Sequence, residues 1–270
     1  MISVVIPTYG QVGVGLVETC IATLWAHHED AIQSVEIFVV LDGSDAEVES
    51  GLRRVAEGYT NVVVLVQEER LGFASACNLG IAASSGAVVF LVNNDIEFYE
   101  PALQAMADCL IQLNAGVVGC RLLYPDRSVQ HGGVVYVRGQ GVDGVPGWFD
   151  HRSRSCREFD PEAYSITPSL VTGALMGISR QALLACGPLD ERYGFTCEDI
   201  DYCLQSLEAG FNPIYLGYVG AIHHEGKTRG ATPEEKAKMP EIAEREQQAL
   251  KLFHEKWVGV DFQNVFRGRG

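Results

Sequence analysis

Three carboxylates lie within four consecutive positions of the segment CEDIDY (197–202), at Glu198, Asp199 and Asp201. The field at the start of a helix favours negative side chains, so simple capping is one interpretation of this cluster. Three acids in four positions exceed what capping requires, and we therefore interpret the segment as functional. The same field would keep Asp199 ionised and able to accept a proton, as a general base does, although it also makes the base weaker.

A further acid, Asp95, ends the apolar run AVVFLVNND (87–95). Its carboxylate is a suitable ligand for a hard divalent cation, and Asn94 beside it could contact a ribose or a water on the phosphate side. An Asx turn is the simpler explanation for Asn93 and Asn94 alone. Later in the chain, HHEGKTRG (223–230) carries two adjacent histidines, which makes it a candidate metal-ligand segment in a chain with seven histidines.

Three more polar segments follow or adjoin apolar runs. VVIPTYG (4–10) offers a Pro-Thr-Tyr turn that could hold a nucleotide base, and LDGSD (41–45) offers Asp42 as an acceptor for a pyrimidine N–H. LGFASACNLG (71–80) offers Asn78 to backbone or ligand, and its glycines permit close approach. Each segment also has a purely structural explanation: a strand exit, a turn cap and a helix packed closely on a sheet.

The elements that must position these residues alternate along the first half of the chain. Short continuous apolar strands interleaved with helices predict a mainly parallel sheet with helices on both faces. Ligands of such sheets bind beyond the carboxyl ends of the strands, which is where PTYG, LDGSD and VNND stand. The predicted strands are 3–7, 35–42, 61–66 and 87–95, and the predicted helices are 13–28, 46–58 and 73–85.

The second half is expected to be less regular. Its segment from about Gly132 to Thr167 is rich in Gly, Pro, Asp and Arg, which predicts a long loop rather than a packed element. We expect this loop to order over a bound ligand. Residues 198–210 predict a helix, and residues 233–257 predict a long helix that Pro240 kinks or splits. The absence of a repeat or a clear linker favours one domain with a helical C-terminal extension.

Composition excludes several classes of protein. The 270 residues are 47% hydrophobic and 20% charged, which is enough for a real core and argues against disorder. A net charge of −15 argues against an extended nucleic-acid surface. The eight cysteines form no CxxC pair, and several lie in apolar runs, so a reducing compartment is expected. Neither a signal peptide nor a spanning apolar run is visible, so we expect a cytoplasmic protein whose membrane contact, if any, is peripheral at the inner face.

Together, six segments in order resemble the motifs of the family 2 glycosyltransferases. VVIPTYG resembles the family's V-IPTYN, LDGSD its DDGSxD and LGFASACNLG its NxGxxxAxNxG, while LVNND stands at its metal-binding DxD position. The segment from TGALMG to LEAGF (172–211) resembles TGxxxxxRRxxxxxxGxFDExFxxxxEDxDLxxRxxxxG. HHEGKTRG is similar to the HxESxSRG loop of the rhamnosyl- and galactosyltransferase-like branch. Each motif is weak alone, but six in order over residues 3 to about 230 are specific.

The resemblance implies a GT-A fold with a Rossmann-like, mainly parallel sheet flanked by helices. It implies an inverting enzyme that moves a sugar from a UDP-sugar or dTDP-rhamnose to an acceptor hydroxyl with Mn²⁺ or Mg²⁺. The acceptor would be a glycan, a lipid-linked molecule or a protein, in glycan, O-antigen or polysaccharide synthesis. A catalytic domain of residues 1–230 would consist of a nucleotide-binding half (1–95) and an acceptor half (96–230), followed by the helical extension 231–270.

The resemblance also implies a role for each matching residue. Asp95 and His223 would bind the metal, with His223 preferred to His224 because it matches the family's spacing. Asp199 would be the catalytic base. The nucleotide would be bound by Pro7, Thr8, Tyr9, Asp42, Asn78 and Asn94. The acceptor would be oriented by Glu198 and Asp201.

The chain departs from the family pattern at three places. Leu41 replaces the first acid of DDGS, so base recognition would depend on Asp42. Asn93 and Asn94 leave the metal motif with one carboxylate, and Gln205 stands where the family often has arginine.

Three other functions compete with this interpretation. A dinucleotide-dependent oxidoreductase would show GxGxxG, whereas residues 10–15 are GQVGVG. A nucleotidyltransferase would show a basic, glycine-rich loop after the first strand, and PTYGQVGVG contains neither Lys nor Arg. A non-catalytic sugar-binding protein of the same fold would be expected to lose the acids at 95 and 199, and both are present.

Overall fold

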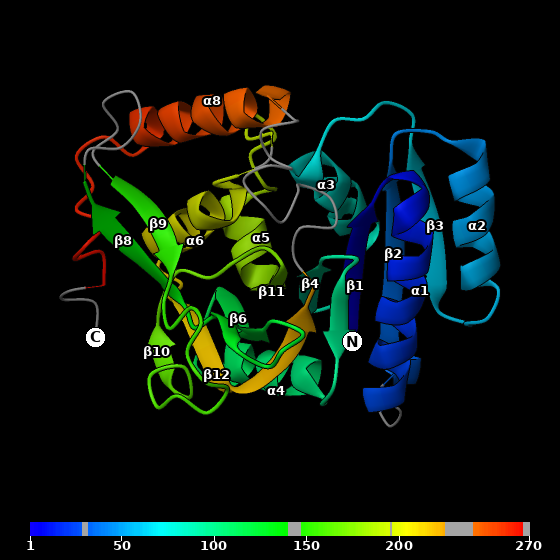
Figure 1. Ribbon diagram of the computed structural model, residues 1–270, viewed down its shortest axis with the longest axis horizontal. Coiled ribbons are helices and arrows are strands. Elements are labelled where there is room, and N and C mark those ends of the chain that lie inside the picture. The colour runs from blue at the N-terminus through cyan, green and yellow to red at the C-terminus, as the bar shows by residue number, and fades with distance from the viewer. Residues whose placement is uncertain (29–31, 140–146, 195, 225–239, 267–270) are drawn as a thin grey trace.

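The computed structural model describes residues 1–28, 32–139, 147–194, 196–224 and 240–266. One large mixed sheet forms its centre. Its strands are β1 (Ile2–Thr8), β2 (Val35–Asp42), β3 (Val62–Gln67), β4 (Val88–Val92), β5 (Ile96–Phe98), β6 (Val117–Leu123), β7 (Val129–His131), β10 (Ile166–Pro168), β11 (Leu175–Ser179) and β12 (Pro213–His223). The main path of the sheet runs β10-β12-β6-β11-β4-β1-β2-β3 (Figure 1), which confirms the predicted α/β class.

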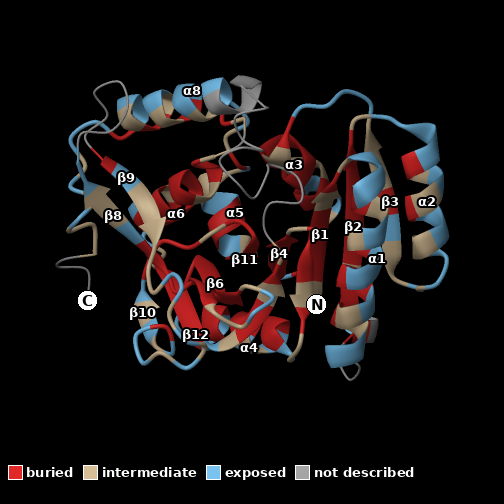
Figure 2. Cartoon of the chain, viewed as in Figure 1, coloured by how far each residue is buried: buried red, intermediate tan, exposed pale blue. Residues whose placement is uncertain are grey.

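Helices cover both faces of this sheet. They are α1 (Gly10–His27), α2 (Ala46–Ala56), α3 (Phe73–Ala83), α4 (Ala102–Gln112), α5 (Arg180–Cys186), α6 (Glu198–Glu208) and α8 (Pro240–Lys256), with a short 3-10 turn at Ile32–Ser34. One core cluster contains residues of α1, α2 and α4, and a second contains residues of α3, α5, α6 and α8. Buried residues therefore run in two layers, one on each side of the sheet (Figure 2).

Alternation along the strands produces these two layers. Phe90 of β4 belongs to the first cluster, whereas its neighbours Val89 and Leu91 belong to the second. Successive side chains of a strand point to opposite faces, so a strand buried on both sides is apolar throughout. Gly80 lets α3 approach β1 closely, because a Cβ at that position would lie 2.3 Å from Cγ1 of Val5. Close packing of the helix on the sheet, the structural explanation for this glycine, is therefore observed.

The second half of the chain brings distant segments to one edge of the sheet. Strand β11 runs antiparallel between β4 and β6, while β12 runs parallel to β6. The register of β12 shifts between Leu216 and Gly220. Its last residue, His223, then lies opposite Ile96 of β5, beside Asp95.

The expectation of a long loop over 132–167 was wrong in part. Two strands, β8 (Val134–Arg138) and β9 (Gly147–His151), pair there as an antiparallel hairpin. The ring of Phe149 lies 5.3 Å from that of Phe253 and 5.4 Å from that of Phe262. Contact with the C-terminal segment therefore gives this hairpin a packed face that its Gly-rich composition did not indicate.

The C-terminal helix is present and belongs to the second core cluster. Helix α8 begins at Pro240, and the start of the predicted helix, residues 233–239, lies outside the described residues. Ala249, Phe253 and Trp257 recur at every fourth residue and are all buried, which is the spacing of one helix face. In the described part of the chain, none of the helices combines the length and the apolar character needed to cross a membrane. The eight cysteines are all free.

Candidate active site

A cleft opens at the carboxyl ends of β1, β2 and β4. This position agrees with the general location of ligand sites on open α/β sheets. Most of the residues predicted to bind nucleotide or metal line it together. The lining residues are Pro7, Thr8, Tyr9, Asp42, Arg70, Gly72, Phe73, Ala76, Asn93, Asn94 and Asp95.

Asp42 shapes one wall of the cleft. Its Oδ1 accepts hydrogen bonds from Gln67 Nε2 and the Leu71 amide, both at 2.8 Å. Its Oδ2 accepts one from the Gly72 amide at 3.0 Å. The turn that follows β3 is therefore fixed by this side chain. Because a carboxylate oxygen can accept two hydrogen bonds, Oδ2 retains capacity for a ligand N–H.

Arg70 is a cleft residue that the motifs did not identify. Its guanidinium carbon lies 3.9 Å from the centroid of the Tyr9 ring. This contact fixes the ring and places a positive charge in the cleft of an otherwise acidic protein. The sequence could have indicated it, because Arg70 is the one basic residue in the segment QEERLG (67–72), which follows the third predicted strand.

Thr8 and Asn94 hold each other at the floor of the cleft. Nδ2 of Asn94 donates to Oγ1 of Thr8 at 2.8 Å, and both residues are buried. Gly13 of α1 packs on the same hydroxyl, because a Cβ there would lie 2.2 Å from Oγ1. The bond ties the end of β1 to the segment that follows β4.

Asp95 and His223 face each other across the edge of the sheet. Oδ1 of Asp95 lies 3.1 Å from Nε2 of His223, and the two residues are only 6% and 9% exposed. The other ring nitrogen of His223, Nδ1, lies 2.6 Å from Oε1 of Gln130, and Nε2 of Gln130 donates to the His223 carbonyl at 3.3 Å. Because Nδ1 donates to the amide oxygen, the lone pair of a neutral His223 points toward Asp95.

This pair suits a divalent cation. A carboxylate oxygen and an imidazole lone pair at this distance need a proton or a cation between them, and an outer residue that orients the histidine is typical of metal sites. Burial alone would raise the pKa of Asp95, but the hydrogen bond and charge of His223 with a proton on Nε2 outweigh it and lower that pKa. The carboxylate is therefore ionised. His224 contacts Glu97 instead, with Nε2 2.8 Å from Oε2.

The protein itself offers few ligands at this position. Within the described ranges, no group of three or more His, Cys, Asp and Glu side chains is placed to hold a metal. A cation at Asp95 and His223 would therefore take its remaining ligands from substrate phosphates and water.

Replacement of Gln130 by methionine should weaken binding of Mn²⁺ in the presence of UDP by about 10- to 100-fold, which is the usual effect of losing an outer-shell partner. The thioether keeps the volume but cannot hold Nδ1 of His223. Calorimetric titration of Mn²⁺ measures the effect, with the exposed Gln104→Met on α4 as the matched control. Equal affinities of the two variants would contradict the role of Gln130.

Asp199 lies on the same edge, joined to the Asn93–Asp95 segment by two residues. Its Oδ2 accepts a hydrogen bond from the Gly173 amide at 2.8 Å. The next carbonyl, of Ala174, accepts one from the Asn93 amide at 2.8 Å. The structure thus brings the predicted base and the predicted metal ligands to one side of the molecule. Asp199 remains partly exposed, which leaves it accessible to a substrate.

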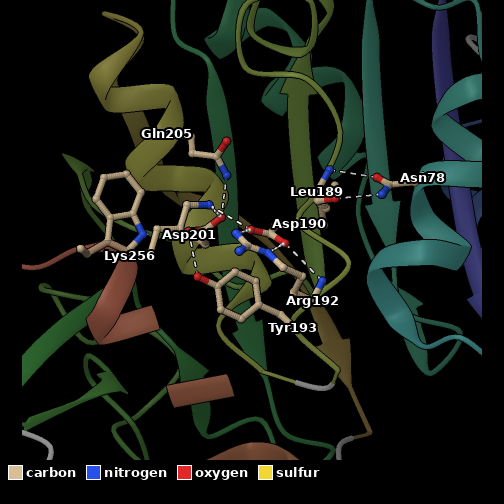
Figure 3. A network of polar contacts seen from close by, with 9 residues as sticks. Asn78, Leu189, Asp190, Arg192, Tyr193, Asp201, Gln205 and Lys256 are labelled. Atoms are coloured by element: carbon tan, nitrogen blue, oxygen red, sulfur yellow. Dashed lines mark hydrogen bonds and ion pairs between the residues drawn. The ribbon is translucent and has the colours of Figure 1, made fainter. Parts of the chain in front are cut away.

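Three predicted site residues, Asn78, Asp201 and Glu198, are placed elsewhere than expected. The side-chain amide of Asn78 forms two hydrogen bonds with the backbone of Leu189, each at 2.9 Å (Figure 3), and its Nδ2 also donates to Oε1 of Glu191 at 2.8 Å. Asn78 does not line the cleft. Asp201 is 0% exposed and accepts hydrogen bonds from four side chains. An acceptor cannot reach it, so its role is structural. Glu198 is also buried, at 5% exposure, and is not part of the cleft lining.

Two solved structures share the fold. A mannosyltransferase from Pyrobaculum calidifontis, in complex with GDP-Man and Mn²⁺, aligns with a TM-score of 0.61 and 17% identity over 99% of this chain and 70% of that one. GalNAc-T7 with UDP, GalNAc and Mn²⁺ aligns with a TM-score of 0.66 and 12% identity over 100% of this chain and 55% of that one. The chain therefore shares the GT-A fold of these two glycosyltransferases.

Sequence comparison then gives the family. Residues 3–183 match Glycosyl transferase family 2, and the chain belongs to this family. The uncharacterized protein y4gI of Sinorhizobium fredii is 31% identical over 250 residues, which cover 88% of this chain and 26% of that protein. The O-antigen biosynthesis protein RfbC of Myxococcus xanthus is 28% identical over 171 residues, which cover 63% of this chain and 13% of that protein. The chain thus matches about a quarter or less of the length of either relative.

Proposed function

We propose that this chain transfers a sugar from a nucleoside diphosphate to an acceptor hydroxyl, with inversion at the anomeric carbon. The observation that carries the proposal is the link between Asp199 and the Asp95–His223 pair through residues 173 and 174. A partly exposed carboxylate and a buried acid–imidazole pair thus lie on two segments that the Asn93–Ala174 hydrogen bond joins. The nucleotides and Mn²⁺ in the two similar structures support the donor class, and the name of RfbC supports an acceptor in O-antigen synthesis.

The donor nucleotide would occupy the cleft. Tyr9, backed by Arg70, offers a flat surface to the base. Oδ2 of Asp42 can accept the N3–H of uracil or thymine in addition to its bond from Gly72. This chemistry favours a UDP- or dTDP-sugar.

Asp95 and His223 would hold a Mn²⁺ or Mg²⁺ ion at the diphosphate. Such a cation, when bound, neutralises the diphosphate and stabilises its charge as it departs. Asp95 supplies the negative charge, while Gln130 keeps the ring of His223 turned toward it. Burial of both side chains strengthens their interaction with a charged ligand.

Asp199 would accept the proton of the attacking hydroxyl. It stands in the first turn of α6, and its two carboxylate oxygens accept hydrogen bonds from the amides of Gly173 and Ile200. A single carboxylate that activates the acceptor is consistent with one direct displacement and hence with inversion.

A panel of nucleotides tests the donor class. UDP or dTDP with Mn²⁺, at about 100 times its Kd, should stabilise the protein by about 2.7 kcal/mol. For a domain of this size that corresponds to a rise in Tm of roughly 5–10 °C. EDTA should remove most of the shift, and NAD⁺ should give none. A larger shift with NAD⁺, or a shift that survives EDTA, would contradict the proposal. NMR of the transferred sugar would then report its anomeric configuration.

A further inference from the structure

The carboxylate of Asp201 is the centre of a buried network on α6 (Figure 3). Its Oδ1 accepts hydrogen bonds from the Tyr193 hydroxyl at 3.1 Å and from Trp257 Nε1 at 2.7 Å. Its Oδ2 accepts them from Gln205 Nε2 at 2.5 Å and from Lys256 Nζ at 2.8 Å. A buried carboxylate needs such partners to remain charged, and α8 with the residue that follows it supplies two of them.

The positive charge beside Asp201 comes from α8. Gln205 is neutral, although it occupies the position where arginine was expected from the motif. Among the described side chains, Lys256 is the cation that forms an ion pair with Asp201. The lysine also lies 3.2 Å from Oδ2 of Asp190, and the Arg192 guanidinium donates one hydrogen bond to each carboxylate oxygen of the same aspartate. The ammonium thus joins α6 to the loop before it.

The first turn of α6 needs support from its surroundings. Cys197, which precedes the turn, has φ +75°, a left-handed conformation that is costly for a residue with a side chain. Its carbonyl accepts a hydrogen bond from the Asp201 amide at 2.8 Å. Asp199 lies on this turn. The buried side chain of Asp201 therefore holds the turn from inside while Asp199 faces Gly173.

We propose that Lys256 and Trp257 are positioning residues for Asp199. By binding Asp201, they fix the orientation of the first turn of α6 and so the direction of the base, which makes the C-terminal helix part of the catalytic unit. The inference rests on the proposed function of Asp199. Both residues lie beyond the 3–183 segment that matches the family. A displacement of a catalytic group by about 1 Å is enough to slow a reaction about 100-fold.

Replacement of Lys256 by methionine tests the proposal. The variant should lower kcat by about 10- to 100-fold, while affinity for UDP and Mn²⁺ stays within about twofold because the cleft is untouched. Lys251→Met, on the same helix and exposed, is the matched control and should behave as wild type. Adding Gln205→Arg to Lys256→Met should restore much of kcat, since the side chain at 205 already reaches Oδ2 of Asp201. If Lys256→Met instead caused a structural defect elsewhere in α8, the Gln205→Arg substitution on α6 would not restore kcat.

Two further measurements separate this proposal from the assignment of the base. In the Asp199→Asn background, Lys256→Met should cause little additional loss, because both changes affect the same group. Hydrogen exchange should accelerate at amides 198–204 in Lys256→Met and remain unchanged in α1.

Should Lys256→Met fail to fold, Trp257→Phe keeps most of the ring volume and removes only the indole N–H that donates to Oδ1 of Asp201.

Each outcome has a defined meaning. If Asp199→Asn is inactive and Lys256→Met retains kcat within twofold with unchanged exchange, the positioning role is overturned. Multiplicative losses in the double variant would overturn it as well. If Asp199→Asn itself retains transfer, the assignment of the base fails, and the exchange at 198–204 still decides whether Lys256 holds the turn.

Discussion

Replacement of Asp199 by asparagine is expected to slow transfer by about 10²–10⁴-fold, the usual cost of losing a general base. The amide keeps the shape of the side chain and can still accept from the Gly173 amide, but it cannot accept the proton of the acceptor hydroxyl. Donor binding should stay nearly unchanged, because Asp199 is not among the residues that line the cleft. Single-turnover transfer from a radiolabelled donor measures the rate, and calorimetry measures the affinity for UDP.

Asp108→Asn is the matched control for this variant. It removes the same charge from an exposed position on α4 that is not part of the cleft lining. It should transfer sugar at the wild-type rate. A kcat for Asp199→Asn within about tenfold of wild type would end the assignment of Asp199 as the base.

Replacement of Asp95 by asparagine should lower the affinity for Mn²⁺ in the presence of UDP on the order of 100-fold. Loss of an outer-shell partner costs about 10- to 100-fold, and Asp95 would be a direct ligand. The variant loses the negative charge that would attract the cation, while the amide of the new side chain can still contact His223. Calorimetric titration with Mn²⁺, repeated with and without EDTA pretreatment, measures the change.

Glu97→Gln provides the comparison, because Glu97 also contacts a histidine but lies outside the cleft lining. Its affinity for Mn²⁺ should match that of the wild-type protein. If Asp95→Asn binds UDP equally well with and without Mn²⁺, and as tightly as wild type does with it, the metal role of Asp95 is wrong.

The sequence was most informative where burial alone decides the structure. Runs such as Val88–Val92 are apolar on both faces, so their place in a covered sheet follows from composition and length. The hairpin of β8 and β9 was missed for the opposite reason. Its stability depends on contacts with Phe253 and Phe262, more than 100 positions away from Phe149, and such long-range packing leaves little local signal.

The site shows the same distinction. Residues directly after the strands, such as Thr8 and Asp95, could be placed because the ends of parallel strands meet at one edge. For Asn78 and Asp201, motif position indicated the right helices but not the direction of the side chains. Asp201 follows Asp199 by two residues on a helix, which turns it by about 200° away from the face that carries Asp199.

Gly173 packs against both Asp199 and Phe73, a residue of the cleft wall. A Cβ at this position would lie 3.3 Å from Cβ of Asp199 on one side and 3.4 Å from the ring of Phe73 on the other. Phe73 lines the cleft, so only the bare backbone of residue 173 separates Asp199, the proposed base, from the cleft wall. A Cβ there would be in tight contact with Asp199 and at the limit of ordinary contact with Phe73. The missing methyl group therefore lets the Asp199 carboxylate lie directly against the Gly173 amide.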